Sequence, residues 1–275
     1  MPVPDDLATA IDIARAAGRV LADGFAGGVS PLIGARHGAA SKTAEFDLVT
    51  EYDRRSEALL VERLAAAFPS DAVIAEEGGS RPGEGSRWYV DPLDGTTNFA
   101  HGLPFFCVAI ARVDASGAVD LGVVHAPVLD LTFTATRGGG AACNGRAIHV
   151  SDARTLDRAM LGTGFPSDRQ TSADTNFAQF VAVKLRARAV RRYGSAALDQ
   201  ALVAAGTYDG FWEMKLKPWD LAAGSLLVIE AGGRATGWQG EPLRLARGAI
   251  VATNGTIHDE LCAVLASAGI PDAVR

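Results

Sequence analysis

The spacing of apolar residues predicts two helices near the start of the chain. Over about residues 5–25, apolar side chains recur at helical intervals: Leu7, Ile11, Ala14, Leu21 and Phe25. A second helix is predicted from Thr50 to Phe68, where Leu59, Leu60 and Leu64 are apolar. The glycine-bearing stretch 27–43 between the two predicts a loop.

The pattern then changes to the short apolar runs of β-strands. Two short strands are predicted, at Val73-Ile74 and at Trp88–Val90, and a meander of antiparallel strands follows from Phe105 to Val150. Turn residues at 114–117 and 127–130 divide this meander into strands at residues 106–110, 119–125 and 131–136.

The second half alternates between helical and strand patterns. Helices are predicted at residues 176–185, 195–205, 220–231 and 258–268, and strands at 187–191, 210–213 and 249–252. Such alternation is typical of an α/β protein. The change of pattern predicts a boundary near residue 150, with one unit over 1–150 (helix pair plus antiparallel sheet) and an α/β unit over 151–275.

Composition narrows the class of protein only slightly. The chain has 275 residues, a net charge of −6 and three cysteines without paired spacing, which predicts reduced thiols in a cytoplasmic protein. The acidic balance argues against a general nucleic-acid binder. The first residues, Met1–Asp6, lack the basic start of a signal peptide, and no apolar run reaches the ~20 residues needed to span a bilayer.

The stretch Trp88–Phe99 carries the strongest chemical signal. Asp91 and Asp94 stand three residues apart in a turn that follows an apolar strand, and Gly95-Thr96 comes next. The turn predicts a helix start, which offers free N–H groups to a phosphate and for which Asp94 is a candidate cap. Carboxylates beside a phosphate need a cation between them, and Mg²⁺ is suited to this role.

Two aspartates at this spacing are by themselves consistent with a helix cap and a surface turn. Three further acidic clusters lie at predicted ends of elements, and this favours a metal site over solvation alone. These clusters are Glu45–Thr50, Ala75–Gly78 and Lys217–Gly224.

Together these stretches resemble the inositol monophosphatase family of magnesium-dependent, lithium-sensitive sugar phosphatases. The matching segments are Asp47-Leu-Val-Thr50, Ala75-Glu-Glu77, the Asp-Pro-Leu-Asp-Gly-Thr-Thr-Asn core of 91–98, and Pro218-Trp-Asp-Leu-Ala-Ala-Gly224. The resemblance covers nearly the whole chain. It implies an αβαβα sandwich of the inositol monophosphatase and fructose-1,6-bisphosphatase type, in which residues 1–150 carry most metal ligands and 151–275 complete the site.

The resemblance also implies roles for individual residues. Two or three Mg²⁺ ions would be held by Glu76, Asp91, the carbonyl of Leu93, Asp94 and Asp220. Gly95 and Thr96 would offer N–H groups to the phosphate, and Asp47, Thr96 and Glu76 would orient or deprotonate the attacking water. Asp94, Gly95, Thr96, Ser195, Ala196 and Glu213 would contact the substrate.

Two of the substrate residues also have simpler interpretations. Ser195 is equally compatible with an ordinary helix cap, and Glu213 with a solvated acid near Lys215 and Lys217. Arg36 and Lys42 precede Asp47, and the spacing does not decide whether either approaches the site.

The resemblance implies hydrolysis of a sugar or polyol phosphate, with myo-inositol 1-phosphate as the favoured substrate and a homodimer as the expected assembly. Fructose-1,6-bisphosphatase, histidinol-phosphatase and nucleotide 3′-phosphatase activities are alternatives on the same scaffold. A regulatory binding protein of the same fold is an alternative of a different class.

Overall fold

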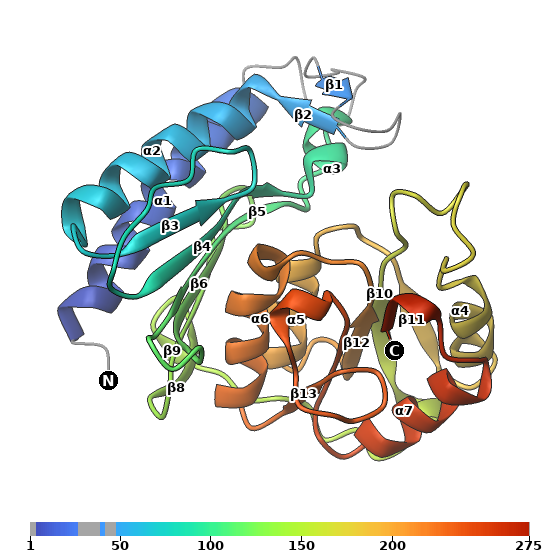
Figure 1. The fold of residues 1–275 in the computed structure, drawn as a ribbon. Helices are drawn as coiled ribbons and strands as arrows, with labels where there is room; N and C mark the ends of the chain where they lie inside the picture. The colour runs from blue at the N-terminus through green and yellow to red at the C-terminus, as the bar shows by residue number, and fades with distance from the viewer. Residues whose placement is uncertain (1–3, 27–38, 42–47, 275) are drawn as a thin grey trace.

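The chain folds into five layers, helices–sheet–helices–sheet–helices, in a computed structural model that describes residues 4–26, 39–41 and 48–274 (Figure 1). The αβαβα sandwich expected from the sequence is thereby confirmed. The first layer holds α1 (Pro4–Ala26) and α2 (Glu51–Ala67). A capping box stabilises the start of α2. The Thr50 side chain accepts a hydrogen bond from the N–H of Asp53, and the Asp53 carboxylate accepts one from the N–H of Thr50.

The second layer is a seven-stranded sheet in the order β3-β4-β5-β6-β7-β8-β9. Only the β3–β4 pair is parallel, and every later neighbour is antiparallel, as the meander predicts. The strands are β3 (Ala72–Ala75), β4 (Arg87–Asp94), β5 (Cys107–Val113), β6 (Val119–Ala126), β7 (Leu131–Thr136), β8 (Gly140–Cys143) and β9 (Arg146–Ala147). A separate antiparallel pair joins β1 (Ala39–Ser41) to β2 (Leu48–Thr50).

The last three layers come from the second half of the chain. The middle helices α5 and α6 lie between the two sheets, and α4 and α7 cover the far side of a five-stranded sheet, ordered β11-β10-β12-β14-β13 (Figure 1). The helices are α4 (Phe177–Lys184), α5 (Ala196–Ala204), α6 (Pro218–Glu230) and α7 (His258–Ser267), and the strands are β10 (Met160–Thr163), β11 (Ala189–Arg191), β12 (Gly210–Glu213), β13 (Arg234–Thr236) and β14 (Ile250–Thr253). Short 3₁₀ turns, η1 to η3, occupy Leu156–Arg158, Leu245–Arg247 and Asp272–Val274.

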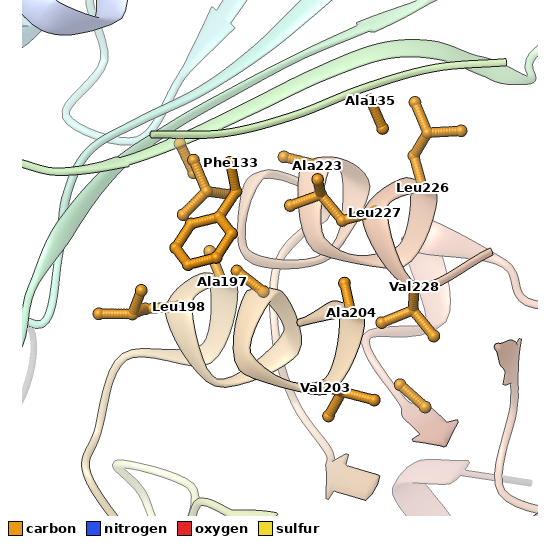
Figure 2. Close-up of a cluster of buried hydrophobic side chains, with 14 of the residues drawn as sticks. Phe133, Ala135, Ala197, Leu198, Val203, Ala204, Ala223, Leu226, Leu227 and Val228 are labelled. Atoms are coloured by element: carbon orange, nitrogen blue, oxygen red, sulfur yellow. The ribbon is translucent and has the colours of Figure 1, made fainter. Parts of the chain in front are cut away.

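Small residues let the middle helices pack tightly against the first sheet. A Cβ at Gly122 of β6 would lie only 3.0 Å from the Cα of Ala223 in α6, so glycine permits this close approach. Figure 2 shows Phe133 of β7 reaching toward α5, with Leu227 of α6 and Ala197 of α5 beside it. This packing holds the start of both helices at the edge where β4 ends.

The sequence predicted the longer elements well and the short ones poorly. All six helices predicted from the apolar pattern are confirmed, with ends shifted by one or two residues, and α2 is capped at Thr50 and Phe68 as expected. The pattern missed β8 and β9, and it also missed β10 and β13, which are three or four residues long. Predicted strand 187–191 begins only at Ala189.

Candidate active site

Four acidic residues from three elements meet where β3 and β4 end. Glu76 follows β3, Asp91 and Asp94 lie in the last part of β4, and Asp220 is in the first turn of α6. Because β3 and β4 are parallel neighbours, their carboxyl ends lie at the same edge of the sheet. The register of β4 against β5 shifts between Asp91 and Asp94, and this irregularity lies within the turn that carries both acids.

Asp91 is at the centre of this acid cluster. Asp91 is 1% exposed, and its carboxyl group lies beside those of Glu76 and Asp220. Its Oδ1 also accepts from the N–H of Leu93 at 3.0 Å. Burial, and then the negative charges of Glu76, Asp94 and Asp220, raise the pKa of Asp91 well above its usual value. A site that crowds buried carboxyls in this way favours a bound cation.

Asp94 does not cap the helix that follows it, contrary to one sequence interpretation. The cap position of α3 (Thr96–Ala100) is Gly95, and no side chain caps that helix. The Asp94 carboxylate instead turns toward the start of α5. Its Oδ2 accepts from Ser195 Oγ at 2.8 Å and from Ala197 N at 2.7 Å, and its Oδ1 accepts from Ala196 N at 3.2 Å. Burial still raises the pKa of Asp94, and these hydrogen bonds oppose that rise.

Asp220 stabilises its own helix as well as facing the other acids. Its Oδ2 accepts from the N–H of Lys217 at 2.7 Å, which closes the first turn of α6. Burial, then the charges of Asp94 and Glu76, raise the pKa of Asp220 to about 8. The acid set therefore consists of one buried carboxyl, Asp91, and three half-buried ones, which repel one another and supply the hard oxygen donors that Mg²⁺ prefers.

Within residues 4–26, 39–41 and 48–274, no three His, Cys, Asp or Glu side chains converge as the ligands of a metal ion would. Asp94 and Asp220 direct carboxylate oxygens to backbone N–H groups, those of Ala196 and Ala197 and that of Lys217. The Leu93 carbonyl, expected as a ligand, accepts from Thr96 Oγ1 at 3.1 Å. In donor chemistry and charge the site suits a divalent cation.

The turn at Gly95-Thr96 has the backbone that the phosphate-binding prediction needs. Gly95 has φ of 101°, and a Cβ there would lie 3.0 Å from the carbonyl oxygen of Phe105, so only glycine is suited to this position. Thr96 Oγ1 lies 3.0 Å from Asp53 Oδ1, to which it can donate. The sequence did not point to Asp53 as a neighbour of this turn. The spacing of Thr50 and Asp53 indicates a capping box, which signals the start of α2 rather than a site residue.

Ser195 is not an ordinary helix cap. It occupies the cap position of α5, but its side chain makes no capping hydrogen bond and donates to Asp94 instead. The side chain is fully buried, and Cys107 Sγ lies 3.6 Å from its Oγ. Ser195 and Ala196 therefore belong to the acid cluster through Asp94, and their contact with substrate stays a prediction.

Glu213 ends β12 beside the same cluster and is not a solvated acid paired with lysines. Lys215 Nζ binds the Asp168 carboxylate at 2.8 Å. Burial, then the charge of Asp220, raise the pKa of Glu213 to about 8, while the positive charge of Arg192 opposes this rise. A Cβ at Gly164 would meet Glu213 Oε1 at 1.9 Å, so glycine at this position makes room for the carboxyl group. Arg192 and Gly164 were not identified from the sequence.

The structure thus brings together Glu76, Asp91, Asp94, Asp220, Ser195, Ala196 and Glu213, with Gly95-Thr96 on the adjoining turn. Asp47, Arg36 and Lys42 lie outside the described residues. Asn98 links this turn to the segment before Ser195, because its Nδ2 donates to the carbonyls of Phe105 at 2.7 Å and Tyr193 at 2.6 Å.

Replacing Ser195 tests the contact between α5 and Asp94. We expect Ser195→Ala to lower the free energy of unfolding of the metal-free protein by about 1.5–3 kcal/mol, the usual worth of a hydrogen bond to a charged group. Urea denaturation measures this, and Ser195→Thr, which keeps the hydroxyl, is the matched control. An alanine variant as stable as the parent protein would contradict the contact.

An acid cluster beside a glycine turn at a helix start is suited to metal-assisted phosphate chemistry. Comparisons with known proteins make the assignment specific: residues 4–269 match the model of the inositol monophosphatase family, and the chain belongs to that family. It is accordingly a phosphoric monoester hydrolase.

Several relatives show how far this similarity extends. The chain is 42% identical over 266 residues to an inositol-1-monophosphatase of Synechocystis, covering 96% of this chain and 91% of that protein. It is 47% identical over 214 residues to the Nus factor SuhB of Pseudomonas aeruginosa, and the match covers 76% of this chain and 79% of that protein. The solved structure of suhB from Bartonella henselae superposes with a TM-score of 0.86 at 37% identity, covering 97% of this chain and 100% of that one.

None of the helices in the described part of the chain is both long and apolar enough to cross a membrane.

Proposed function

We propose that the protein hydrolyses myo-inositol 1-phosphate to myo-inositol and phosphate with the help of Mg²⁺. The observation that carries this proposal is the position of Asp91, a buried carboxyl that lies beside those of both Glu76 and Asp220. A single carboxyl between two others is suited to bridging two metal ions, the arrangement used to displace a phosphate in line.

The proposed ligands are the carboxylates of Glu76, Asp91, Asp94 and Asp220 and the carbonyl of Leu93. When bound there, Mg²⁺ supplies positive charge that lowers the pKa of the attacking water and stabilises the leaving oxygen. The Asp94 carboxylate also accepts from the N–H groups of Ala196 and Ala197, and its remaining lone pairs are the ones proposed to bind the cation.

The remaining roles belong to the protein's own donors and acceptors. Gly95 and Thr96 are proposed to bind the phosphate through their N–H groups at the start of α3. The hydroxyl of Thr96, which Asp53 can hold by accepting from it, is proposed to orient the attacking water together with Glu76 and Asp47. Ser195 is proposed to position Asp94 and the α5 terminus against the sugar ring.

Glu213 is proposed to accept hydrogen bonds from the substrate's hydroxyl groups. We expect Glu213→Gln to raise KM for inositol 1-phosphate by about tenfold while kcat changes much less, because a recognition contact far from the reacting phosphate is lost. Steady-state kinetics measure both constants. Glu62→Gln, an exposed change of the same kind on α2, is the control. A KM equal to that of the parent protein would exclude this role.

A phosphate-release panel with Mg²⁺ tests the substrate. It compares inositol 1-phosphate, fructose 1,6-bisphosphate, histidinol phosphate and 3′-phosphoadenosine 5′-phosphate, each with and without lithium. The proposal expects the highest kcat/KM with inositol 1-phosphate and inhibition by lithium. If the enzyme prefers another compound of the panel, that compound replaces inositol 1-phosphate as the proposed substrate. If phosphate is released from none of the four compounds, the regulatory binding role is favoured. The homodimer, the cytoplasmic location and the absence of nucleic-acid binding stay predictions.

A further inference from the structure

A cavity lies at the opposite ends of the two elements, β4 and α6, that carry three of the four acids. It has a volume of about 620 Å³ and is lined by the beginning of β4, at Arg87 and Tyr89, and by the second half of α6, at Ser225–Glu230. Ile229 lies about 14 Å along α6 from Asp220, from the rise of 1.5 Å per residue. The cavity is therefore distinct from the catalytic site, although β4 and α6 connect the two.

The walls of this cavity are mainly apolar. Leu226 and Val113 are buried beneath it, and Leu243 and Leu245 line the side formed by η2. Ile229 is 49% exposed, which leaves an apolar side chain facing solvent at the wall. Cavities of ~300–1,000 Å³ with apolar walls and a few polar groups are the usual sites for small organic ligands.

The rim of the cavity carries an excess of positive charge. Of its three arginines, Arg137 is paired with Asp114 at 3.1 Å. Among the residues that the structure describes, neither Arg87 nor Arg244 has an acidic side chain within ion-pair distance. The rim's one acid, Glu230, accepts from the N–H groups of Gly138 and Gly140 at 2.9 Å, so both of its oxygens are already engaged.

We propose that this cavity binds a small organic anion with an apolar body, whose charged group is held by Arg87 and Arg244. The apolar walls would take the body of the ligand, and the guanidinium groups of Arg87 and Arg244 would take a carboxylate, sulfonate or phosphate. An uncharged ligand would gain only the wall contacts, and a compact inorganic anion only the rim contacts.

A pair of fluorescent probes separates these contributions. Anilinonaphthalene sulfonate has the apolar body and the anionic group, and N-phenyl-naphthylamine has the same body without the charge. Each is titrated into the full-length protein with Mg²⁺ and saturating inorganic phosphate, which keeps the catalytic site occupied. The Arg87→Gln/Arg244→Gln variant is compared with Arg154→Gln/Arg158→Gln, which removes two exposed arginines elsewhere.

We expect one saturable sulfonate site whose Kd rises at least about tenfold in the Arg87/Arg244 variant, which corresponds to about 1.4 kcal/mol, and less than about twofold in the Arg154/Arg158 variant. The uncharged probe should bind equally to both arginine variants, and Ile229→Glu should weaken both probes. The proposal would be overturned if the two double-arginine variants weakened sulfonate binding equally, or if the sulfonate showed no saturable binding. Loss of binding in Val181→Asp, which changes an exposed apolar position on α4, would also overturn it.

Discussion

Asp91→Asn is expected to abolish magnesium-dependent phosphate release while leaving the fold intact. The amide is nearly the same size as the carboxyl, but it carries no charge and cannot bridge two cations. Asp91 lies beside both Glu76 and Asp220, so its carboxylate is well placed to serve both proposed metal positions. A fall in kcat of at least about three orders of magnitude corresponds to a loss of about 4 kcal/mol in transition-state stabilisation.

Phosphate release and circular dichroism together check this result. Asp157→Asn, an exposed change of the same kind in η1, is the matched control and should leave turnover unchanged. The metal-free variant should also be no less stable than the parent protein, because it relieves repulsion among buried carboxyls. Persistent magnesium-dependent turnover in Asp91→Asn would show that the site has been misassigned.

Magnesium is expected to raise the melting temperature, and more strongly at alkaline pH. Burial, then the charges of Asp94 and Glu76, raise the pKa of Asp220 from 3.8 to about 8, and burial, then the charge of Asp220, raise that of Glu213 from 4.5 to about 8. A carboxyl whose folded pKa is raised stabilises the native state fully below its unfolded pKa. That contribution is lost as the pH rises through the folded pKa. The metal-free protein should therefore become less stable between about pH 4 and pH 8.

Bound cations remove that repulsion, and fewer protons compete for the same oxygens as the pH rises. At a magnesium concentration about a hundred times its Kd, ligand linkage supplies about 2.7 kcal/mol. For a chain of this size that is a rise of about 5–10 °C. Thermal melts at pH 5 and pH 8.5, with Mg²⁺ or with a chelator, measure the effect. Asp220→Asn should flatten the pH dependence, whereas a parent melting temperature unmoved by Mg²⁺ at both pH values would count against the metal site.

Local signals account for the parts of the fold that were predicted well. The start of α2 is specified within four residues, since Thr50 and Asp53 satisfy each other's backbone N–H groups, and its end follows from Phe68 and the proline after it. By contrast, β10 is only four residues long and is defined by its parallel neighbours β11 and β12. Met160 pairs with Ala189, 29 residues later, and Leu161 pairs with Gly210, 49 residues later. Strands of that kind carry little local pattern, because their stability comes from partners distant in sequence.

The sequence by itself determined the chemistry of this protein: which acids gather at the ends of elements, the glycine turn beside them, and the family that these residues indicate. Those features depend on residue type and short spacing, which the chain displays directly. The tertiary structure alone decided which groups satisfy those acids. Asp94 looked like a cap for the helix next to it, yet its partners are Ser195 and Ala197, about a hundred residues later. For Glu213 the sequence left a solvated acid open as an alternative, and the packing of β12 instead places it half-buried near Asp220 with a raised pKa. Burial and long-range hydrogen bonds arise only when distant segments pack together, and they set the charge and direction of each side chain in the site.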